Sequence, residues 1–206
     1  MERKGASAMA SEKTLRYYNE YADAFVQDTK NVSFSEIQDR FTSLLHPGAK
    51  ILDLGCGSGR DALAFLRKGF LVEAADGSRE MVRLCKEAGI PTRQMLFEEL
   101  DACEEYDGLW ACASLLHCSP DELEKIFPLL ARALKPGGVL YCSFKYGNFQ
   151  GERNGRYFCD LTESSFLDLI SQLDLTVLDL WTSHDVRKGR NDLIWLNVLC
   201  RKGIKE

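Results

Sequence analysis

The chain has 206 residues, a hydrophobic content of 45%, a charged content of 28% and a formal net charge of −5. These values are ordinary for a globular protein and give no global attraction to nucleic acid. No apolar run reaches the ~20 residues that a membrane-spanning helix needs, and residues 1–10 lack the apolar core of a secretory signal. We therefore expect no membrane partner, a flexible tail over residues 1–10, and one domain over residues 11–206.

The N-terminal part of that domain is expected to be helical. Over residues 12–28, Tyr18, Ala22 and Phe25 recur at the spacing of an amphipathic helix that packs on a core. A second helix is expected over residues 34–45.

The most informative segment is an apolar strand, residues 50–54, followed by Gly55-x-Gly57-x-Gly59 and a helix over residues 61–68. Glycines take positive φ and let backbone N–H groups approach a ligand closely. Dinucleotide-binding proteins use the spacing G-x-G-x-x-G, whereas here the third glycine comes one residue early and Arg60 occupies the usual third-glycine position. By itself the segment is compatible with a cofactor turn and with an ordinary tight loop, and the residues that follow it decide between them.

A second apolar strand, residues 70–75, ends at Asp76, about 20 residues beyond the glycine turn. An acid in that place can accept hydrogen bonds from both hydroxyls of an adenosine ribose. The alternative is a structural turn in which Ser78 caps the next helix, and both roles are compatible.

The remaining chain alternates strands and helices. Strands are expected over residues 92–95, 108–112, 139–144, 175–182 and 193–201, and helices over residues 121–134 and 163–172. This βαβ alternation predicts an α/β fold in which a mostly parallel sheet is covered by helices on both faces. Ligands of such sheets bind beyond the carboxyl ends of the strands.

The glycine turn with Asp53 before it, the acid Asp76, the pair Tyr106-Asp107 and the turn Leu134-Lys135-Pro136-Gly137-Gly138 occur in the order of the class I S-adenosylmethionine-dependent methyltransferases. The chain resembles that family and, within it, the compact small-molecule enzymes grouped with the tellurite-resistance methyltransferases. The resemblance implies a Rossmann-like, doubly wound sheet of seven strands in the order 3-2-1-4-5-7-6, the last antiparallel. It also implies an N-terminal helical lid, residues 11–45.

The resemblance further implies S-adenosyl-L-methionine as cofactor, with S-adenosyl-L-homocysteine as its product. The acid Asp53 would lie near the ammonium, Arg60 near the carboxylate, and Met81 and Phe97 beside the adenine. The full set of expected cofactor-binding residues is Tyr18, Asp53, Gly55, Gly57, Gly59, Arg60, Asp76, Gly77, Met81, Phe97 and Ala113.

Residues that would meet the methyl acceptor are less well marked. His117 follows the fourth strand, where it is either a base or a structural histidine. The segment 145–157 reads as a long, glycine-bearing loop with several cations. Together with Arg187, its arginines Arg153 and Arg156 suggest an anionic acceptor, the alternative being a solvated loop with a structural Arg–Asp pair.

We therefore predict a methyltransferase for a small, anionic acceptor, with an RNA or tRNA methyltransferase and a non-catalytic cofactor-binding module as alternatives. The eight cysteines include no C-x-x-C pair, which predicts no metal site, mostly buried thiols and a cytoplasmic location. A minor alternative is metalloid methylation with Cys118 and Cys159 as thiol ligands. The sequence does not indicate an oligomeric state.

Overall fold

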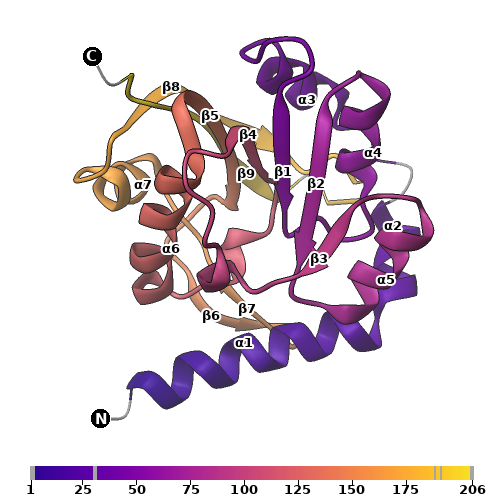
Figure 1. The fold of residues 1–206 in the computed structure, drawn as a ribbon. Helices are drawn as coiled ribbons and strands as arrows, with labels where there is room; N and C mark the ends of the chain where they lie inside the picture. The colour runs from indigo at the N-terminus through magenta and orange to yellow at the C-terminus, as the bar shows by residue number, and fades with distance from the viewer. Residues whose placement is uncertain (1–2, 30–31, 188, 191, 205–206) are drawn as a thin grey trace.

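The computed structural model describes residues 3–29, 32–187, 189–190 and 192–204, and the side chains of these from residue 12 onward. Within them, seven strands form one sheet in the order β3-β2-β1-β4-β5-β9-β8 (Figure 1). The bounds are β1 Lys50–Leu54, β2 Leu71–Asp76, β3 Thr92–Gln94, β4 Tyr106–Ala111, β5 Leu134–Lys145, β8 Leu175–His184 and β9 Ile194–Lys202.

The strand directions confirm the predicted doubly wound topology. The strands β1 to β5 pair in parallel, while β9, the last strand in the chain, runs antiparallel to both β5 and β8. The order reverses between β1 and β4, so the carboxyl ends of these two strands flank the point where such sheets bind ligands.

Helices cover both faces of the sheet because side chains alternate along each strand. In β4, Leu109 and Ala111 pack in one apolar cluster with the helices α6 and α7, whereas Trp110 packs in the other with α3 and α4. The helices are α3 Ser35–Thr42, α4 Arg60–Arg67, α5 Arg79–Glu87, α6 Pro120–Ala133 and α7 Glu163–Ile170, with short 3-10 turns η1 Phe97–Glu99 and η2 Leu115–His117.

The N-terminal region is two helices rather than the single one expected over residues 12–28. Helix α1 spans Arg3–Glu20 and helix α2 spans Ala22–Thr29, with a bend at Tyr21. Helix α1 begins inside the segment expected as a tail, of which residues 1–2 lie outside the described residues; the flexibility of that tail stays a prediction. Figure 1 shows α1 running across the end of the sheet where β6 and β7 also lie.

The segment after β5 is a correction to the sequence analysis, which expected a loop over residues 145–157. Strands β6, Gln150–Arg153, and β7, Arg156–Cys159, form an antiparallel hairpin. Its turn is Asn154-Gly155, with φ of 51° and 76°. Asn-Gly is a strong hairpin signal because both positions of such a turn need positive φ. The sequence thus carried this signal, and the interpretation missed it.

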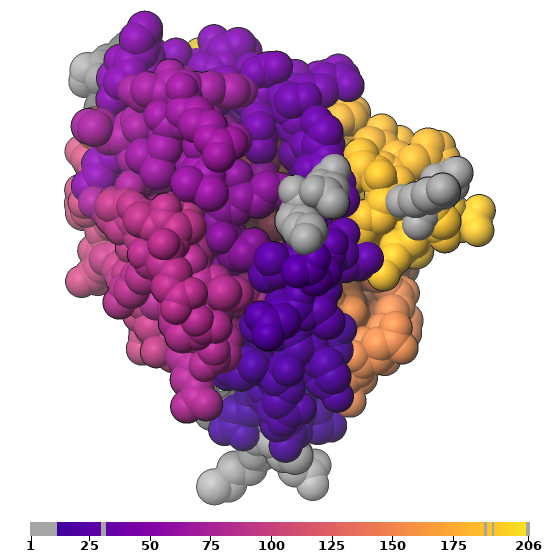
Figure 2. Space-filling view, turned by 90° about the vertical axis from the view of Figure 1, so that its right-hand side faces the viewer, coloured from indigo at the N-terminus to yellow at the C-terminus, as the bar shows by residue number. Residues whose placement is uncertain are grey.

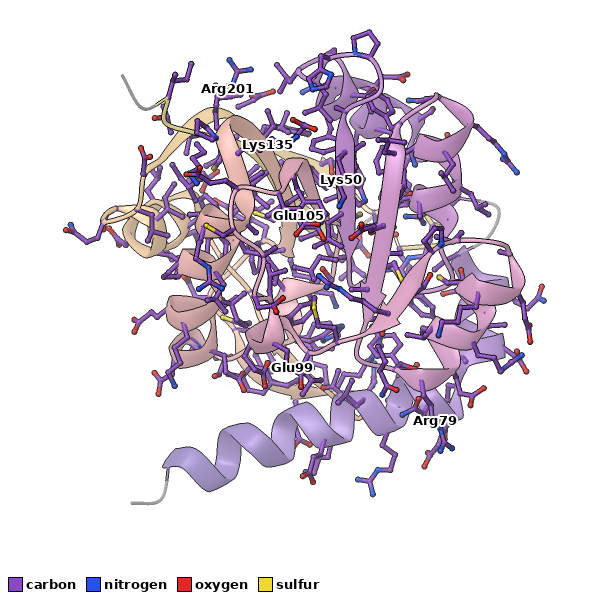
Figure 3. All side chains as sticks on the ribbon, viewed as in Figure 1. Lys50, Arg79, Glu99, Glu105, Lys135 and Arg201 are labelled. Carbon is purple, nitrogen blue, oxygen red and sulfur yellow. The ribbon has the colours of Figure 1, made fainter. Side chains whose placement is uncertain are left out.

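The opposite end of the sheet is held by ion pairs between strand starts. Lys50 contacts Glu105 at 2.6 Å, and Lys135 contacts Asp107 at 2.9 Å. Figure 3 shows Lys50, Glu105 and Lys135 away from α1, whereas the labelled Glu99 lies beside it. These charged residues therefore connect neighbouring strands at the end of the sheet away from α1, and ligands are expected at the end beside α1.

Candidate functional site

A cavity of about 250 Å³ lies at the carboxyl ends of the strands, under the N-terminal helices. In the space-filling view of Figure 2 the N-terminal segment lies between the central and the C-terminal parts of the chain. Most predicted site residues line this cavity: Tyr18, Asp53, Gly55, Gly57, Arg60, Asp76, Gly77, Met81, Phe97, Ala113, His117, Arg156 and Arg187. Gly59 and Arg153 are not among the lining residues.

The glycine turn between β1 and α4 has left-handed backbone conformations, which favour glycine. Gly55, Gly57 and Gly59 have φ of 75°, 54° and 83°. A Cβ on Gly55 would lie 2.3 Å from the Cβ of Ser114, and one on Gly59 would lie 2.3 Å from Ile90. Gly59 is therefore a packing residue at the start of α4, and Gly55 and Gly57 present the backbone to the cavity.

Asp76, at the end of β2, closes this turn. Its carboxylate accepts hydrogen bonds from the backbone N–H of Gly57 at 2.9 Å and of Ser78 at 2.8 Å. Burial raises the pKa of Asp76 to about 6, although the two N–H bonds act in the opposite direction. Ser78 caps α5 by accepting from the N–H of Met81, as predicted, and the ribose role of Asp76 stays a prediction that this cap permits. Each oxygen of the Asp76 carboxylate accepts one of the two N–H hydrogen bonds and can accept another.

The other acid, Asp53, is fully enclosed at the end of β1. It accepts a hydrogen bond from the N–H of Ala62 at 3.1 Å, in the first turn of α4. Burial, and then the neighbouring carboxylate of Asp61, raise the pKa of Asp53. Asp53 thus places a carboxyl group at the helix N-terminus under the cavity, where the sequence predicts the ammonium of the cofactor.

Asp61 is an organising residue that the sequence analysis did not single out. Its carboxylate accepts hydrogen bonds from Gln38 at 2.8 Å, from Trp110 at 3.0 Å and from two nitrogens of Arg60. Arg60 also stacks on the ring of Phe34 at 4.0 Å. Arg60 lines the cavity as expected, but its guanidinium is committed to Asp61, so its role toward a ligand carboxylate stays a prediction.

Two apolar side chains expected beside the adenine line the cavity. Met81 is buried in α5, and Phe97 begins η1; their contact with an adenine stays a prediction. Ala113, after β4, has a φ of 52°, and its N–H donates to the hydroxyl of Ser143 at 2.9 Å. A polar hydroxyl of β5 therefore fixes the turn that should lie under the sulfonium.

His117 lies in η2 and contacts the lid helix. Its Nε2 is 2.8 Å from the Tyr18 hydroxyl, and its Nδ1 is 2.7 Å from the carbonyl of Tyr157. A carbonyl can only accept, so Nδ1 carries the proton and the Tyr18 hydroxyl donates to Nε2. Burial lowers the pKa of His117 to about 4, and the nearby cations Arg156 and Lys145 add to this effect. The imidazole is thus neutral near pH 7 and both of its nitrogens are engaged.

Helix α1 is attached on both sides of the cavity. Asn19 accepts hydrogen bonds from the Ser78 hydroxyl at 2.9 Å and from the N–H of Glu80 at 3.3 Å, at the start of α5. On the hairpin side, Thr14 accepts from the N–H of Tyr157 at 3.1 Å. These contacts give α1 the position of a cover over the cavity.

The three predicted arginines have different surroundings. Arg153 pairs with Asp160 at 2.8 Å, and Arg187 pairs with Asp185 through two nitrogens. Arg156 has no carboxylate within ion-pair distance among the described residues, and its buried Nε has no acceptor there. The sequence does not distinguish these three arginines, whereas in the structure Arg153 and Arg187 are each paired with a carboxylate.

The two thiols considered as metalloid ligands, those of Cys118 and Cys159, are buried. Cys118 lines the cavity, and burial raises its pKa well above the ordinary value; burial also raises the pKa of Cys159 to about 11. Protonated thiols are poor nucleophiles and metal ligands. Within the part of the chain that the structure describes, no group of three metal-binding side chains occurs and no helix is long and apolar enough to cross a membrane.

Comparisons with known proteins agree with this geometry. Residues 51–138 match the family described as "Methyltransferase domain". The chain is 32% identical over 123 residues to "Methyltransferase GfsG" of Streptomyces halstedii, covering 52% of this chain and 43% of that protein. The chain therefore spans less than half the length of this curated relative.

Two solved structures extend the likeness beyond the matched segment. The 1,6-didemethyltoxoflavin-N1-methyltransferase of Burkholderia thailandensis, solved with S-adenosylhomocysteine, has a TM-score of 0.75 and 23% identity, covering 98% of this chain and 91% of its own. TehB of Haemophilus influenzae has a TM-score of 0.70 and 16% identity, covering 88% and 66%. At these identities the structures show a shared fold. The match over residues 51–138 agrees with the family resemblance inferred from the sequence.

Proposed function

We propose that this chain, a member of the S-adenosylmethionine-dependent methyltransferase family, transfers a methyl group from S-adenosyl-L-methionine to a small-molecule acceptor. The observation that carries the proposal is the Asp76 carboxylate beside the positive-φ glycine turn, facing a cavity under a helical cover. A buried acceptor at this point suits a ribose diol, because each hydroxyl needs an acceptor once it leaves water.

The cavity residues fit the rest of the cofactor. The N-terminus of α4 and the enclosed Asp53 lie at one end, as a carboxylate and an ammonium require. Met81 and Phe97 offer apolar contact for an adenine. When bound, the cofactor supplies an activated methyl group on a cationic sulfur.

The chain's own residues orient and enclose the reactants. In-line methyl transfer depends mainly on alignment, so the rigid turns at Gly55 and Ala113 and the cover α1 act by positioning. His117 is neutral near pH 7, but both of its nitrogens are hydrogen-bonded and its pKa is about 4. We therefore assign it a positioning role between α1 and the hairpin rather than that of general base.

A thermal-shift comparison tests the cofactor. S-adenosylhomocysteine should raise the melting temperature, because a ligand that binds only the folded chain stabilises it, and NAD should have little effect. The reverse ranking contradicts the proposal. A screen of acceptors with labelled methyl donor then tests turnover: binding of cofactor without transfer to any acceptor would favour the non-catalytic module.

The RNA alternative makes a different prediction. It rests on the cations of residues 145–157, of which Arg153 is paired with a carboxylate, and the chain is acidic overall. Binding dominated by phosphate contacts would weaken steeply with salt. If a tRNA fraction is methylated and its binding shows that salt dependence, the small-molecule proposal is wrong. A cytoplasmic location is proposed from the eight free cysteines, since reducing compartments keep thiols unpaired.

A further inference from the structure

The acceptor end of the cavity carries more positive than negative charge. Its ion pairs are Arg153 with Asp160, Arg187 with Asp185, and Arg190 with Asp28. After these pairings, Lys145 and Arg156 are left without an acidic partner at ion-pair distance among the described residues, although Asp160 is close enough to affect Lys145. Both line the cavity.

The surroundings of Arg156 keep its guanidinium in place without satisfying it. The guanidinium lies 4.3 Å from the centre of the Tyr17 ring and 5.3 Å from that of Phe158. One terminal nitrogen lies 3.4 Å from the Tyr18 hydroxyl, at the long limit for a hydrogen bond, and the buried Nε has no acceptor. A buried donor without an acceptor leaves the guanidinium only partly satisfied by the protein.

Lys145, at the end of β5, lies near the same aromatic ring as Arg156. Its ammonium lies 4.3 Å from the centre of the Phe158 ring, so this ring lies close to both cations. Lys145 comes two residues after Ser143 on β5, so both side chains point to the same face. Burial lowers the pKa of Lys145. The positive charges of Arg153, Arg156 and Arg187 lower this pKa further, whereas the negative charge of Asp160 raises it.

We propose that Lys145 and Arg156 together bind an anionic group of the methyl acceptor, a carboxylate, a phosphate monoester or an inorganic oxyanion. The inference rests on the proposed function and names the acceptor class of that same cavity. It replaces the expectation of a clamp by Arg153, Arg156 and Arg187, because Arg153 and Arg187 already hold carboxylates. Arg156 offers a planar fork to two oxygens, and Lys145 adds a point charge.

The strand geometry also separates the anion from the methyl group. Ser143 accepts the N–H of Ala113, where the methionine moiety is proposed, and Lys145 lies one side-chain repeat further along β5, about 7 Å away. An acceptor larger than a single oxyanion would therefore present its nucleophile toward Ala113 and its anionic group toward Lys145. Cation recognition would then act in orientation as well as in affinity.

The test measures binding without turnover. Benzoate, inorganic phosphate and the neutral analogue benzamide are titrated by calorimetry into the full chain, with and without S-adenosylhomocysteine. Benzoate or phosphate should bind more tightly than benzamide, by about tenfold or more. The affinities of benzoate and phosphate, compared with each other, distinguish a carboxylate acceptor from a phosphate acceptor. Binding of both benzoate and phosphate no tighter than that of benzamide, or binding of no anion in either condition, overturns the proposal.

Three variants locate the effect. Arg156→Gln and Lys145→Met should each weaken anion binding about tenfold or more while leaving benzamide unchanged, and Arg156→Lys should restore only part of the affinity. The control is Lys125→Gln, which removes one exposed charge on α6 outside the cavity. Anion affinity that falls equally in Lys125→Gln, or stays unchanged in folded Arg156→Gln, overturns the proposal.

The same titrations keep the two proposals distinguishable. S-adenosylhomocysteine affinity is measured for every variant and reports both folding and the cofactor site. A wild type that binds the anion selectively but not S-adenosylhomocysteine contradicts the proposed function and supports the anion site. One that binds S-adenosylhomocysteine without anion selectivity contradicts only the inference.

Discussion

The hydroxyl of Tyr18 in α1 donates a hydrogen bond to Nε2 of His117 at 2.8 Å, across 99 positions of sequence. Because Nδ1 of the same ring donates to the carbonyl of Tyr157, the imidazole connects the covering helix to both η2 and the hairpin. Tyr18 thus reaches the cavity wall as the sequence predicts, and its hydroxyl is engaged by the protein itself.

Replacing Tyr18 by Phe should lower the free energy of unfolding by about 1–3 kcal/mol, because Nε2 of a buried neutral histidine loses the donor that it has among the described residues. Urea unfolding measures the change. The matched control is Tyr17→Phe, which keeps the ring next to Arg156 and should cost no more than about 0.5 kcal/mol. Equal losses in the two variants would show that the Tyr18–His117 bond contributes little.

Replacing Asp76 by Ala should weaken S-adenosylhomocysteine binding by roughly 1–3 kcal/mol, because two ribose hydroxyls lose their acceptor and the N–H groups of Gly57 and Ser78 lose theirs. Calorimetry on both proteins decides this. Asp101→Ala, which removes an exposed acid outside the cavity, should bind as the wild type does. Unchanged affinity in folded Asp76→Ala would remove the assignment of the ribose site.

The raised pKa of Asp76, about 6, predicts two opposite pH trends. Cofactor affinity should fall as the pH drops through about 6, since protonation removes acceptor capacity from the carboxylate. Stability should move the other way: the folded chain holds a proton that the unfolded chain, with an ordinary pKa of 3.8, has released, so this group favours folding more as the pH falls from about 6 to about 4. Titration and urea unfolding from pH 4 to pH 8 measure the two trends.

The variant Asp76→Asn isolates these effects from those of other groups. The difference between wild type and variant should depend on pH in both measurements. A constant difference across that range would mean that Asp76 does not titrate there.

Replacing Gly55 by Ala should destabilise the chain more than replacing Gly48, although the two have nearly the same φ of 75° and 74°. Both variants bear the cost of a left-handed alanine, about 1 kcal/mol. Only at Gly55 would the new Cβ lie 2.3 Å from Ser114; nothing lies within 4 Å at Gly48. Thermal unfolding should show the extra loss at Gly55, with weaker S-adenosylhomocysteine binding. Equal losses would contradict the close approach of the turn to Ser114.

The cofactor half of the site could be predicted from sequence because its signals are local. Residues 50–76 contain a strand, a turn that needs positive φ, and an acid at the end of the next strand. Because these two strands pair in parallel, their carboxyl ends lie side by side. The hairpin turn Asn154-Gly155 was equally local and was missed, since the cations and glycines around it suggested a loop.

The acceptor half was decided by tertiary structure, because the state of a charged group depends on what lies opposite it. Arg153 and Arg156 are three residues apart and look alike in sequence, yet one meets Asp160 and the other meets aromatic rings and no carboxylate. Lys145 gains its place beside Arg156 only when the hairpin folds back over the end of β5. Sequence alone therefore determined the glycine turn and the acid that follows it, whereas only folding decided which cations lack a carboxylate partner, since pairing depends on distances between side chains of different elements.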